Sequence, residues 1–154
     1  MSSQKILLPY NFTSYDQKAL DFAIRSFAHQ KDVEITLFNA YTPVPDIEVR
    51  GSPVMETMRG NLGYLSQKIK EQEDELKVVR NKLLEKGFSK DRIHTIFEPK
   101  KKDIAGDIID LALKGRFNVV VLNRKPGKII RFFTGSVFNK VVTSLKEATV
   151  CIVS

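Results

Sequence analysis

The stretch KILLPYNFTSYDQKALDFAIRSFAHQKDVEITLFNAY, residues 5–41, decides the fold because its hydrophobic period changes twice. Lys5–Pro9 is a short apolar run closed by a proline and followed by turn-forming residues, which predicts a first strand and its exit loop. Apolar residues then recur at helical spacing over about residues 15–30, with Thr13 or Ser14 available as the N-cap. Val33–Tyr41 alternates and then becomes apolar, as in an inner strand. The chain therefore begins with a strand, a helix and a strand.

The same alternation continues to the end of the chain. Residues 42–54 contain three prolines and a glycine, which predicts the longest loop, and a long helix follows over about residues 55–87. The remaining elements are predicted as a strand at Arg92–Glu98, a helix around Ile104–Ala112, a strand at Phe117–Leu122, a helix around Val137–Leu145 and a strand at Ala148–Val153.

Strands that are apolar on both faces and separated by helices predict an α/β fold, a three-layer, doubly wound sandwich with a five-stranded parallel sheet. A length of 154 residues favours one domain, residues 1–154. In such sheets ligands bind outside the carboxyl ends of the strands, where the strand order reverses. We therefore look for function in the loops after the first, second and fourth strands.

The long helix has an apolar stripe at alternating spacings of three and four residues, interrupted at Gln72. This spacing suits a coiled-coil partner, and it also suits a helix that lies on the domain's own sheet. Gly60 and Gly63 weaken its first turns. We expect the helix to pack on the domain's own sheet. The stripe consists of Met55, Met58, Leu62, Leu65, Ile69, Leu76, Val79 and Leu83.

The composition, with 42% hydrophobic and 28% charged residues, is that of a globular protein. The first residues lack the apolar run of a signal peptide or a membrane span, which predicts a cytoplasmic protein without a membrane partner. Cys151 lies in an apolar run, where a buried and inert thiol is expected. The net charge of +7 favours acidic partners, and residues 122–142 carry five basic residues and no acidic one.

Two segments, Lys5-Ile-Leu-Leu-Pro-Tyr-Asn11 near the start of the chain and Thr134-Gly-Ser-Val-Phe-Asn-Lys-Val-Val142 near its end, resemble segments of the universal stress protein family. The opening Lys5-Ile-Leu-Leu-Pro-Tyr-Asn11 is similar to the family's first strand, which ends in a Pro-x-Asp element. Asn118–Leu122, Thr134–Val142 and Ala148–Val153 resemble its last inner strand, its phosphate loop with the following helix, and its edge strand. The resemblance covers the whole chain except the proline-rich loop and the long helix.

The resemblance implies an adenine nucleotide alpha hydrolase-like sheet of order 3-2-1-4-5 and a homodimer through the C-terminal edge strand, residues 148–153. It also implies, as in many members, ATP bound between strands one and four. The nucleotide-binding members carry G-x2-G-x9-G-[ST]. Aligning this motif on Gly135-Ser136 places Leu122 and Lys125 at the first two glycines, and Gly127 falls two places beyond the second. The resemblance therefore predicts an altered phosphate loop.

Half of the phosphate chemistry is retained at Gly135, Ser136 and Val137, where the free N–H groups and the dipole of the last helix form an anion site. Leu122 and Lys125 lack the freedom of glycine to bring the backbone close to phosphate oxygens. Basic side chains crowd the same loop. They either replace the lost donors by pairing with a triphosphate, or form a solvated basic loop, which is the commoner outcome for a run of charges. They are Arg124, Lys125, Lys128 and Arg131.

Two further positions match nucleoside contacts of the family, and a third residue, Asn123, is polar at the carboxyl end of the fourth strand. Asn11 stands where an Asp helps to hold the nucleoside, and it either binds the ligand through its amide or only stabilises the turn. Ala40 stands where the backbone meets the adenine edge. Asn123 either faces the crevice or caps the loop. The complete candidate site is Pro9, Asn11, Ala40, Asn123, Arg124, Lys125, Gly127, Lys128, Gly135, Ser136 and Val137.

No catalytic or metal-binding pattern is present in the sequence. Neither His29 nor His94 has a neighbouring nucleophile motif, and their spacing to Cys151 matches no metal site. Acidic residues interrupt the basic surface of the long helix, which disfavours nucleic-acid binding.

The sequence therefore predicts a non-catalytic stress-response or signalling module that resembles universal stress proteins and binds ATP or a related nucleotide weakly or not at all. The alternative is a nucleotide-independent protein-interaction module that uses the long helix and the proline-rich loop to bind a protein partner. An adenylyl-transferring enzyme ranks last, because Tyr10–Ser14 is not glycine-rich.

Overall fold

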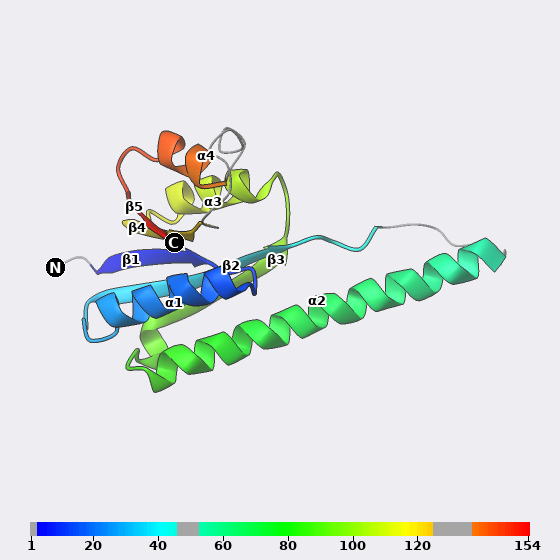
Figure 1. Ribbon diagram of the computed structural model, residues 1–154, viewed down its shortest axis with the longest axis horizontal. Coiled ribbons are helices and arrows are strands. Elements are labelled where there is room, and N and C mark those ends of the chain that lie inside the picture. Colours follow the sequence, from blue (N-terminus) through cyan, green and yellow to red (C-terminus); the bar gives the residue numbers. More distant parts are fainter. Residues whose placement is uncertain (1–2, 46–52, 125–136) are drawn as a thin grey trace.

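Strands and helices alternate along the whole chain, as the computed structural model in Figure 1 shows. The structure describes residues 3–45, 53–124 and 137–154. The strands and α-helices are β1 (Gln4–Pro9), α1 (Ser14–Phe27), β2 (Val33–Tyr41), α2 (Pro53–Glu85), β3 (Ile93–Pro99), α3 (Ile104–Lys114), β4 (Val119–Asn123), α4 (Val137–Ser144) and β5 (Thr149–Val153).

The five strands form one parallel sheet in the order β3-β2-β1-β4-β5, which confirms the predicted fold. Ile6 of the central β1 pairs with Ile35 of β2 on one side and with Val119 of β4 on the other. The chain adds β2 and β3 on one side of β1 and then crosses to add β4 and β5. The order of the strands therefore reverses between β1 and β4, which is where a sheet of this kind binds ligands.

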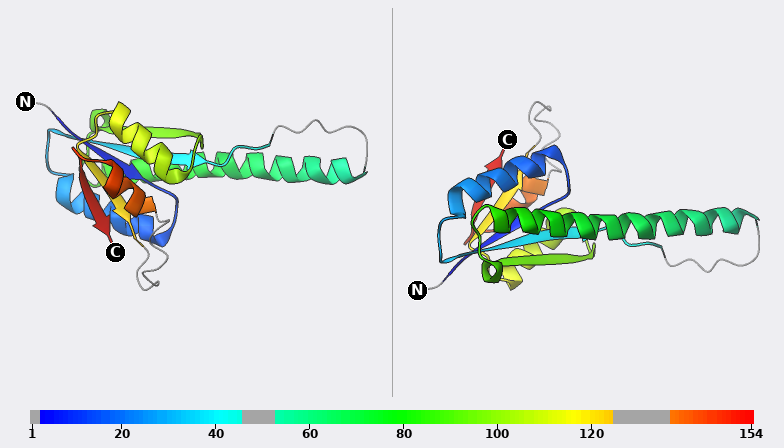
Figure 2. Two further views of the ribbon diagram at one scale, coloured as in Figure 1. Left: turned by 90° about the horizontal axis from the view of Figure 1, so that it is seen from above. Right: turned by 90° about the horizontal axis from the view of Figure 1, so that it is seen from below.

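Helices cover both faces of the sheet, and each face has its own apolar core (Figure 2). Ile6 and Leu8 of β1 pack in the core with α1 and part of α2, while Leu7 packs in the core with α3 and α4. This alternation follows from the two-residue period of a strand. Because both faces are covered, the inner strands β1, β2 and β4 are largely buried and apolar, as the sequence indicated, whereas the edge strands β3 and β5 keep exposed residues.

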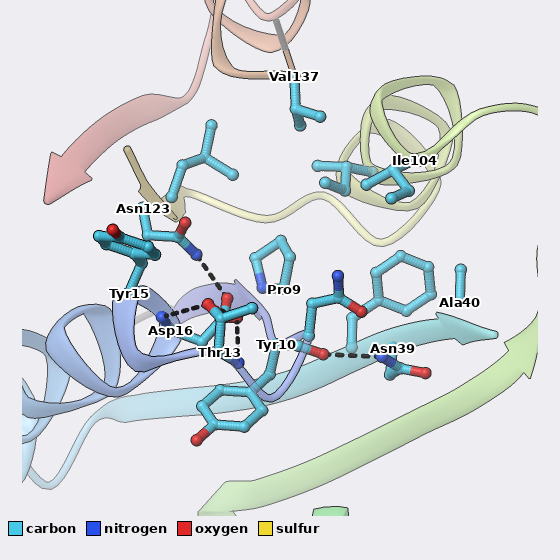
Figure 3. Close-up of a pocket in the computed structure, with 14 residues that line it drawn as sticks. Pro9, Tyr10, Thr13, Tyr15, Asp16, Asn39, Ala40, Ile104, Asn123 and Val137 are labelled. Atoms are coloured by element: carbon cyan, nitrogen blue, oxygen red, sulfur yellow. Dashed lines mark hydrogen bonds between the residues drawn. The ribbon is translucent and has the colours of Figure 1, made fainter. Parts of the chain in front are cut away.

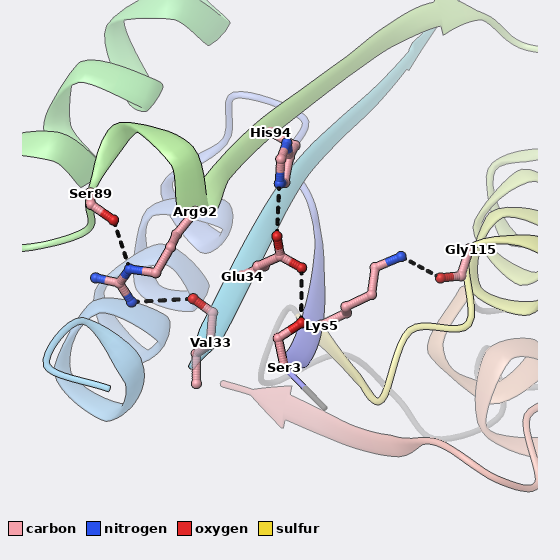
Figure 4. A network of polar contacts seen from close by, with 8 residues as sticks. All are labelled: Ser3, Lys5, Val33, Glu34, Ser89, Arg92, His94 and Gly115. Carbon is pink, nitrogen blue, oxygen red and sulfur yellow. Dashed lines mark hydrogen bonds and ion pairs between the residues drawn. The ribbon is translucent and has the colours of Figure 1, made fainter. Parts of the chain in front are cut away.

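Polar side chains at the amino-terminal edge of the sheet bind neighbouring backbone groups and tie the helix ends to the strands (Figure 4). The Arg92 guanidinium donates to backbone carbonyls at the ends of α1 and α2, where helices leave carbonyls unpaired. On the other face, Lys5 Nζ donates to the carbonyl of Gly115 at 2.6 Å. Arg92 therefore ties the ends of two helices to β2. Its acceptors are the carbonyl oxygens of Ala28, Gln30, Val33 and Gly87 and the hydroxyl of Ser89.

The helix α2 lies on the sheet along only part of its length. Leu76, Val79 and Leu83 are buried against the sheet, but from Pro53 to Gln72 the helix extends past the carboxyl edge of the sheet (Figures 1 and 2). In that part no described side chain is buried. We call residues 53–72 the projecting half and residues 73–85 the packed half.

The prediction that the whole apolar stripe packs on the domain's own sheet is thus right for the packed half and wrong for the projecting half. The reason is length. A helix of 33 residues spans about 50 Å, whereas the longest strand, with nine residues, spans only about 30 Å.

Several element boundaries also differ from the predictions. The first helix ends at Phe27, three residues before the predicted Gln30. The long helix begins at Pro53, inside the predicted loop. Proline is tolerated at the first position of a helix, because the N–H that it lacks would have no partner in the first turn. The rest of that loop, residues 46–52, lies outside the described residues. In the part of the chain that the structure describes, no helix combines the length and the apolar character needed to cross a membrane.

Candidate functional site

A cavity of about 400 Å³ opens at the carboxyl ends of β1, β2 and β4, beside the point where the strand order reverses (Figure 3). Ligand pockets usually have volumes of roughly 300–1,000 Å³ and mostly apolar walls with a few polar groups. The apolar lining residues are Pro9, Phe38, Ala40, Ile104, Ile108, Leu122 and Val137. The lining residues with polar groups are Tyr10, Asn11, Thr13, Tyr15, Asp16, Asn39 and Asn123.

The loop between β1 and α1 forms one wall and is held in an unusual conformation. Phe12 has a φ of 62°, which a bulky side chain rarely adopts, and it lies between the lining residues Asn11 and Thr13. The Phe12 ring packs edge-on against the Tyr10 ring, with the centroids 5.3 Å apart. This strain is of the kind that proteins keep at ligand sites, where it costs about 1–3 kcal/mol.

A capping box fixes the start of α1 next to the cavity. Thr13 Oγ1 accepts a hydrogen bond from the backbone N–H of Asp16 at 3.2 Å. In return Asp16 Oδ2 accepts hydrogen bonds from the backbone N–H and the hydroxyl of Thr13, at 3.0 and 2.6 Å. The pattern Thr13-x-x-Asp16 therefore satisfies the first orphan amides of the helix.

Asp16 also joins the start of α1 to the end of β4 beside the cavity. Only 2% of this residue is exposed, and its Oδ1 accepts a hydrogen bond of 2.5 Å from Nδ2 of Asn123 at the end of β4 (Figure 3). Both carboxylate oxygens are therefore occupied by protein donors. Asp16 is the single charged residue among the described residues that line the cavity, and these bonds make it a structural element of the wall.

On the β2 side, Asn39 fixes the loop that follows β1. Its Nδ2 donates to the carbonyl of Tyr10 at 2.9 Å, and its Oδ1 is buried and accepts no hydrogen bond from the described residues. The Tyr10 side chain points away from the cavity into the core under α1 and α2 (Figure 3). Burial, reinforced by the charge of Asp16, raises the pKa of Tyr10 to about 12, so its phenol is neutral at all physiological pH values.

The structure brings together five of the candidate residues that sequence analysis named. They come from β1 and its loop, β2, β4 and the first turn of α4, and they are Pro9, Asn11, Ala40, Asn123 and Val137. Asn123 faces the crevice, and there it donates to Asp16.

Arg124 is not among the residues that line this cavity. Its backbone N–H donates to the Val153 carbonyl at 2.8 Å and its Nη2 donates to the Ser154 hydroxyl at 3.0 Å, so the side chain contacts the end of β5. The remaining candidates are the residues of the altered phosphate loop, and they lie outside the described residues. They are Lys125, Gly127, Lys128, Gly135 and Ser136.

Sequence analysis missed several lining residues. Thr13 and Asp16 could have been found as a capping box, since their spacing has that signature. Ile104 and Ile108 looked like core positions of a helix, and only the packing of α3 over the ends of β1 and β2 places them at the cavity.

Among residues 3–45, 53–124 and 137–154, no three His, Cys, Asp or Glu side chains gather as a metal site requires. Cys151 is half-buried rather than buried as predicted, because β5 is an edge strand, and this partial burial raises the pKa of its thiol.

Comparison with known proteins identifies the family. The sequence model of a protein family, described as the universal stress protein family, matches residues 2–152 of the chain. No curated protein sequence matches the chain significantly.

Solved structures show the same fold at low sequence identity. A universal stress protein in complex with cAMP is 16% identical, with a TM-score of 0.65 over 100% of this chain and 98% of that one. The universal stress protein from Archaeoglobus fulgidus in complex with dAMP is 15% identical, with a TM-score of 0.59 over 100% of both chains. A family protein from Arabidopsis thaliana with AMP bound is 16% identical, with a TM-score of 0.61 over 97% of this chain and 90% of that one.

Proposed function

Because the chain belongs to the universal stress protein family, we propose that it is a stress-response module without catalytic activity of its own, whose crevice binds an adenine nucleotide. The observation that carries this proposal is the cavity between the Asn11 loop and the start of α4, at the point where the strand order reverses. Structures of the same fold hold cAMP, dAMP and AMP, which supports an adenine nucleotide as the class of ligand.

The walls of the cavity suit a purine base. Phe38, Ile108 and Leu122 supply apolar surface, and the short side chain of Ala40 leaves the backbone at the end of β2 accessible to a ring edge. Asn11 and Asn123 supply amides for the polar part of a nucleoside. We expect the base against β2 and the ribose near Asn11.

Phosphate recognition is proposed at the start of α4. The first N–H groups of that helix and its dipole favour an anion, and Val137 of its first turn lines the cavity. Leu122, the residue before the end of β4, aligns with a glycine of the nucleotide-binding motif, so its Cβ limits how closely the backbone can approach phosphate. We therefore expect affinity for AMP or cAMP to equal or exceed affinity for ATP, with Lys125 and Lys128 as proposed phosphate contacts.

The absence of catalysis is proposed from the chemistry of the described lining. Asp16 is its single carboxylate, and both oxygens accept hydrogen bonds from the protein. A general base must be accessible to the proton that it removes, but Asp16 is 2% exposed and three of its roughly four acceptor positions are already filled. The described lining residues therefore offer no group that would activate water against a phosphate.

Isothermal titration with AMP, cAMP and ATP tests the proposal directly. We expect saturable binding, and a ligand present at a hundredfold excess over its dissociation constant should stabilise the folded state by about 2.7 kcal/mol. Ile104→Trp should abolish binding, because Ile104 lines the cavity, whereas Leu113→Trp on the same helix should not, because Leu113 is exposed and lies elsewhere. Absence of binding by the unmodified protein at millimolar nucleotide would refute the proposal.

A second candidate function, a protein-interaction module, is favoured by one observation, the projecting half of α2. On this hypothesis the crevice stays empty and α2 binds a protein partner. Charged substitutions in the projecting half should then abolish partner binding without lowering the stability of the domain.

The homodimer through residues 148–153 also remains a proposal. The edge position of β5 and the 40% exposed Ile152 support it.

A further inference from the structure

The projecting half of α2 carries an apolar seam that continues the seam of the packed half. Met58, Leu62, Leu65 and Ile69 follow the same alternation of three and four residues as Leu76, Val79 and Leu83. In the packed half this seam is buried on the sheet. In the projecting half Leu65 is 39% exposed, and the other three side chains are only half-buried. A strict alternation of this kind is the period that lets a second helix pack along the seam.

The seam of the projecting half is symmetric about the point between Gly63 and Tyr64. Leu62 and Leu65 lie at equal distances on either side of that point, and so do Met58 and Ile69, while the next pair outward, Met55 and Gln72, is apolar on one side only. A two-fold axis through this point would place a second copy of the helix antiparallel to the first, with Leu62 on Leu65 and Met58 on Ile69. An interface between identical chains requires this self-complementarity, which an unrelated partner would not require.

The lengths of the two halves also fit an antiparallel pair. In this register the first residue of one helix, Pro53, lies opposite Asp74 of the other, just before Leu76 enters the core. Each helix would therefore cover the projecting half of the other and end where the other domain begins. A parallel pair would instead bring the two domains to the same end of the seam, where Leu76 and Val79 are already covered.

Charge complementarity supports the same arrangement. The residues opposite the start of the partner helix form an exposed acidic cluster. The start of a helix carries a partial positive charge from its dipole and is stabilised by nearby carboxylates. In this register Lys68 is level with Arg59 of the partner copy, but the two flank opposite sides of the seam. On its own side Lys68 faces Asn61 of the partner copy, so it meets no like charge. The acidic cluster is Glu71, Glu73, Asp74 and Glu75.

We propose that the occupant of this seam is a second copy of the chain, which pairs antiparallel through the projecting halves of α2 about an axis between Gly63 and Tyr64. This contact is independent of nucleotide binding and distinct from pairing at the β5 edge.

Sedimentation of the full chain tests the contact, with Ile152→Lys as the parent to suppress pairing through β5. The parent should be a dimer. Adding Leu62→Glu and Leu65→Glu should raise its dissociation constant at least about 100-fold, because carboxylates would enter an apolar seam without partners. Tyr64→Glu is the matched control, because Tyr64 is 66% exposed and lies outside the seam, and it should leave the dimer intact. A monomeric parent, or a dimer that survives both Glu substitutions, would overturn the proposal.

Distances between spin labels test the geometry and decide the question if the Glu variant does not fold. In the Ile152→Lys parent with Cys151→Ser, labels at Tyr64→Cys should lie close together, at about the 8–10 Å between packed helix axes plus the label arms. Labels at Asn81→Cys should lie about 50 Å apart, because each is 17.5 residues from the axis at about 1.5 Å per residue. A short distance at residue 81 would show a parallel pair and overturn the proposal.

Discussion

The two halves of α2 share one sequence pattern and have different surroundings. In the packed half, Leu76 and Leu83 are buried under the sheet, while in the projecting half the same seam extends past the edge of the sheet. The comparison shows that a regular apolar stripe predicts which face of a helix packs against another surface, but does not predict which surface that is. The four predictions below test this comparison, beginning with the largest expected effect.

Leu83→Ala should lower the free energy of unfolding by about 2–5 kcal/mol, because Leu83 is fully buried in the packed half and its loss leaves a cavity. Leu65→Ala is the same substitution in the projecting half and should cost less than about 1 kcal/mol at concentrations where the protein is monomeric. Chemical denaturation of both variants measures the difference. Equal losses would show that the projecting half belongs to the core.

Arg92→Ala should lower the free energy of unfolding by about 2 kcal/mol, because it removes the donor shared by the carbonyls at the ends of α1 and of the packed half. Arg92→Lys keeps the charge but cannot reach both helix ends, so it should recover less than half of the loss. Hydrogen exchange should locate the damage at residues 28–33 and 83–88. Damage confined to the projecting half would contradict this role.

The unfolding free energy should fall with pH between about 10 and 12 because of Tyr10, which lies beneath the packed half. The phenol ionises near pH 10 in the unfolded chain but only near pH 12 in the folded one. The contribution of Tyr10 to the unfolding free energy is therefore constant below pH 10 and is lost as the pH rises toward 12. The slope from this group approaches about 1.4 kcal/mol per pH unit. Tyr10→Phe should remove that part of the slope, and an identical slope in the variant would contradict the assignment.

Gly60→Ala should increase the helix content of the projecting half, with a local gain of about 0.5–1 kcal/mol, because an added Cβ meets nothing within 4 Å. Circular dichroism and hydrogen exchange measure this gain. Gly115→Ala is the opposite case, since its Cβ would clash with the Phe117 ring, and it should destabilise the domain. A loss of helix in Gly60→Ala would mean that this face is in contact with another surface.

Much of the fold followed from local patterns. The apolar runs at Ile6–Leu8 and Val119–Leu122 and the helical stripe through Ala19, Leu20 and Ala23 are buried as their periods indicated. The boundaries were predicted less accurately, because helix ends depend on capping contacts such as the bond from Arg92 to the end of α1, which joins residues distant in sequence.

The crevice was predictable only in part. Pro9, Asn11 and Ala40 were named from the resemblance to the family and Asn123 from its place at the end of a strand, and parallel strands bring such ends together. Asp16, Ile104 and Ile108 were missed, because their local patterns predict a helix cap and a helix core equally well. The contact between Asp16 and Asn123 joins residues 107 positions apart, so no local pattern could reveal it.

The sequence by itself determined the order of strands and helices, the apolar character of both faces of the sheet and the apolar seam along α2, because these follow from periodicity over neighbouring residues. The tertiary structure alone decided that Asp16 is satisfied by Asn123, that Ile104 lines a cavity, and that the sheet ends before α2 does. The physical reason is that burial depends on which distant surfaces meet, and the length of the sheet, set by its strands, fixes where the cover over α2 stops.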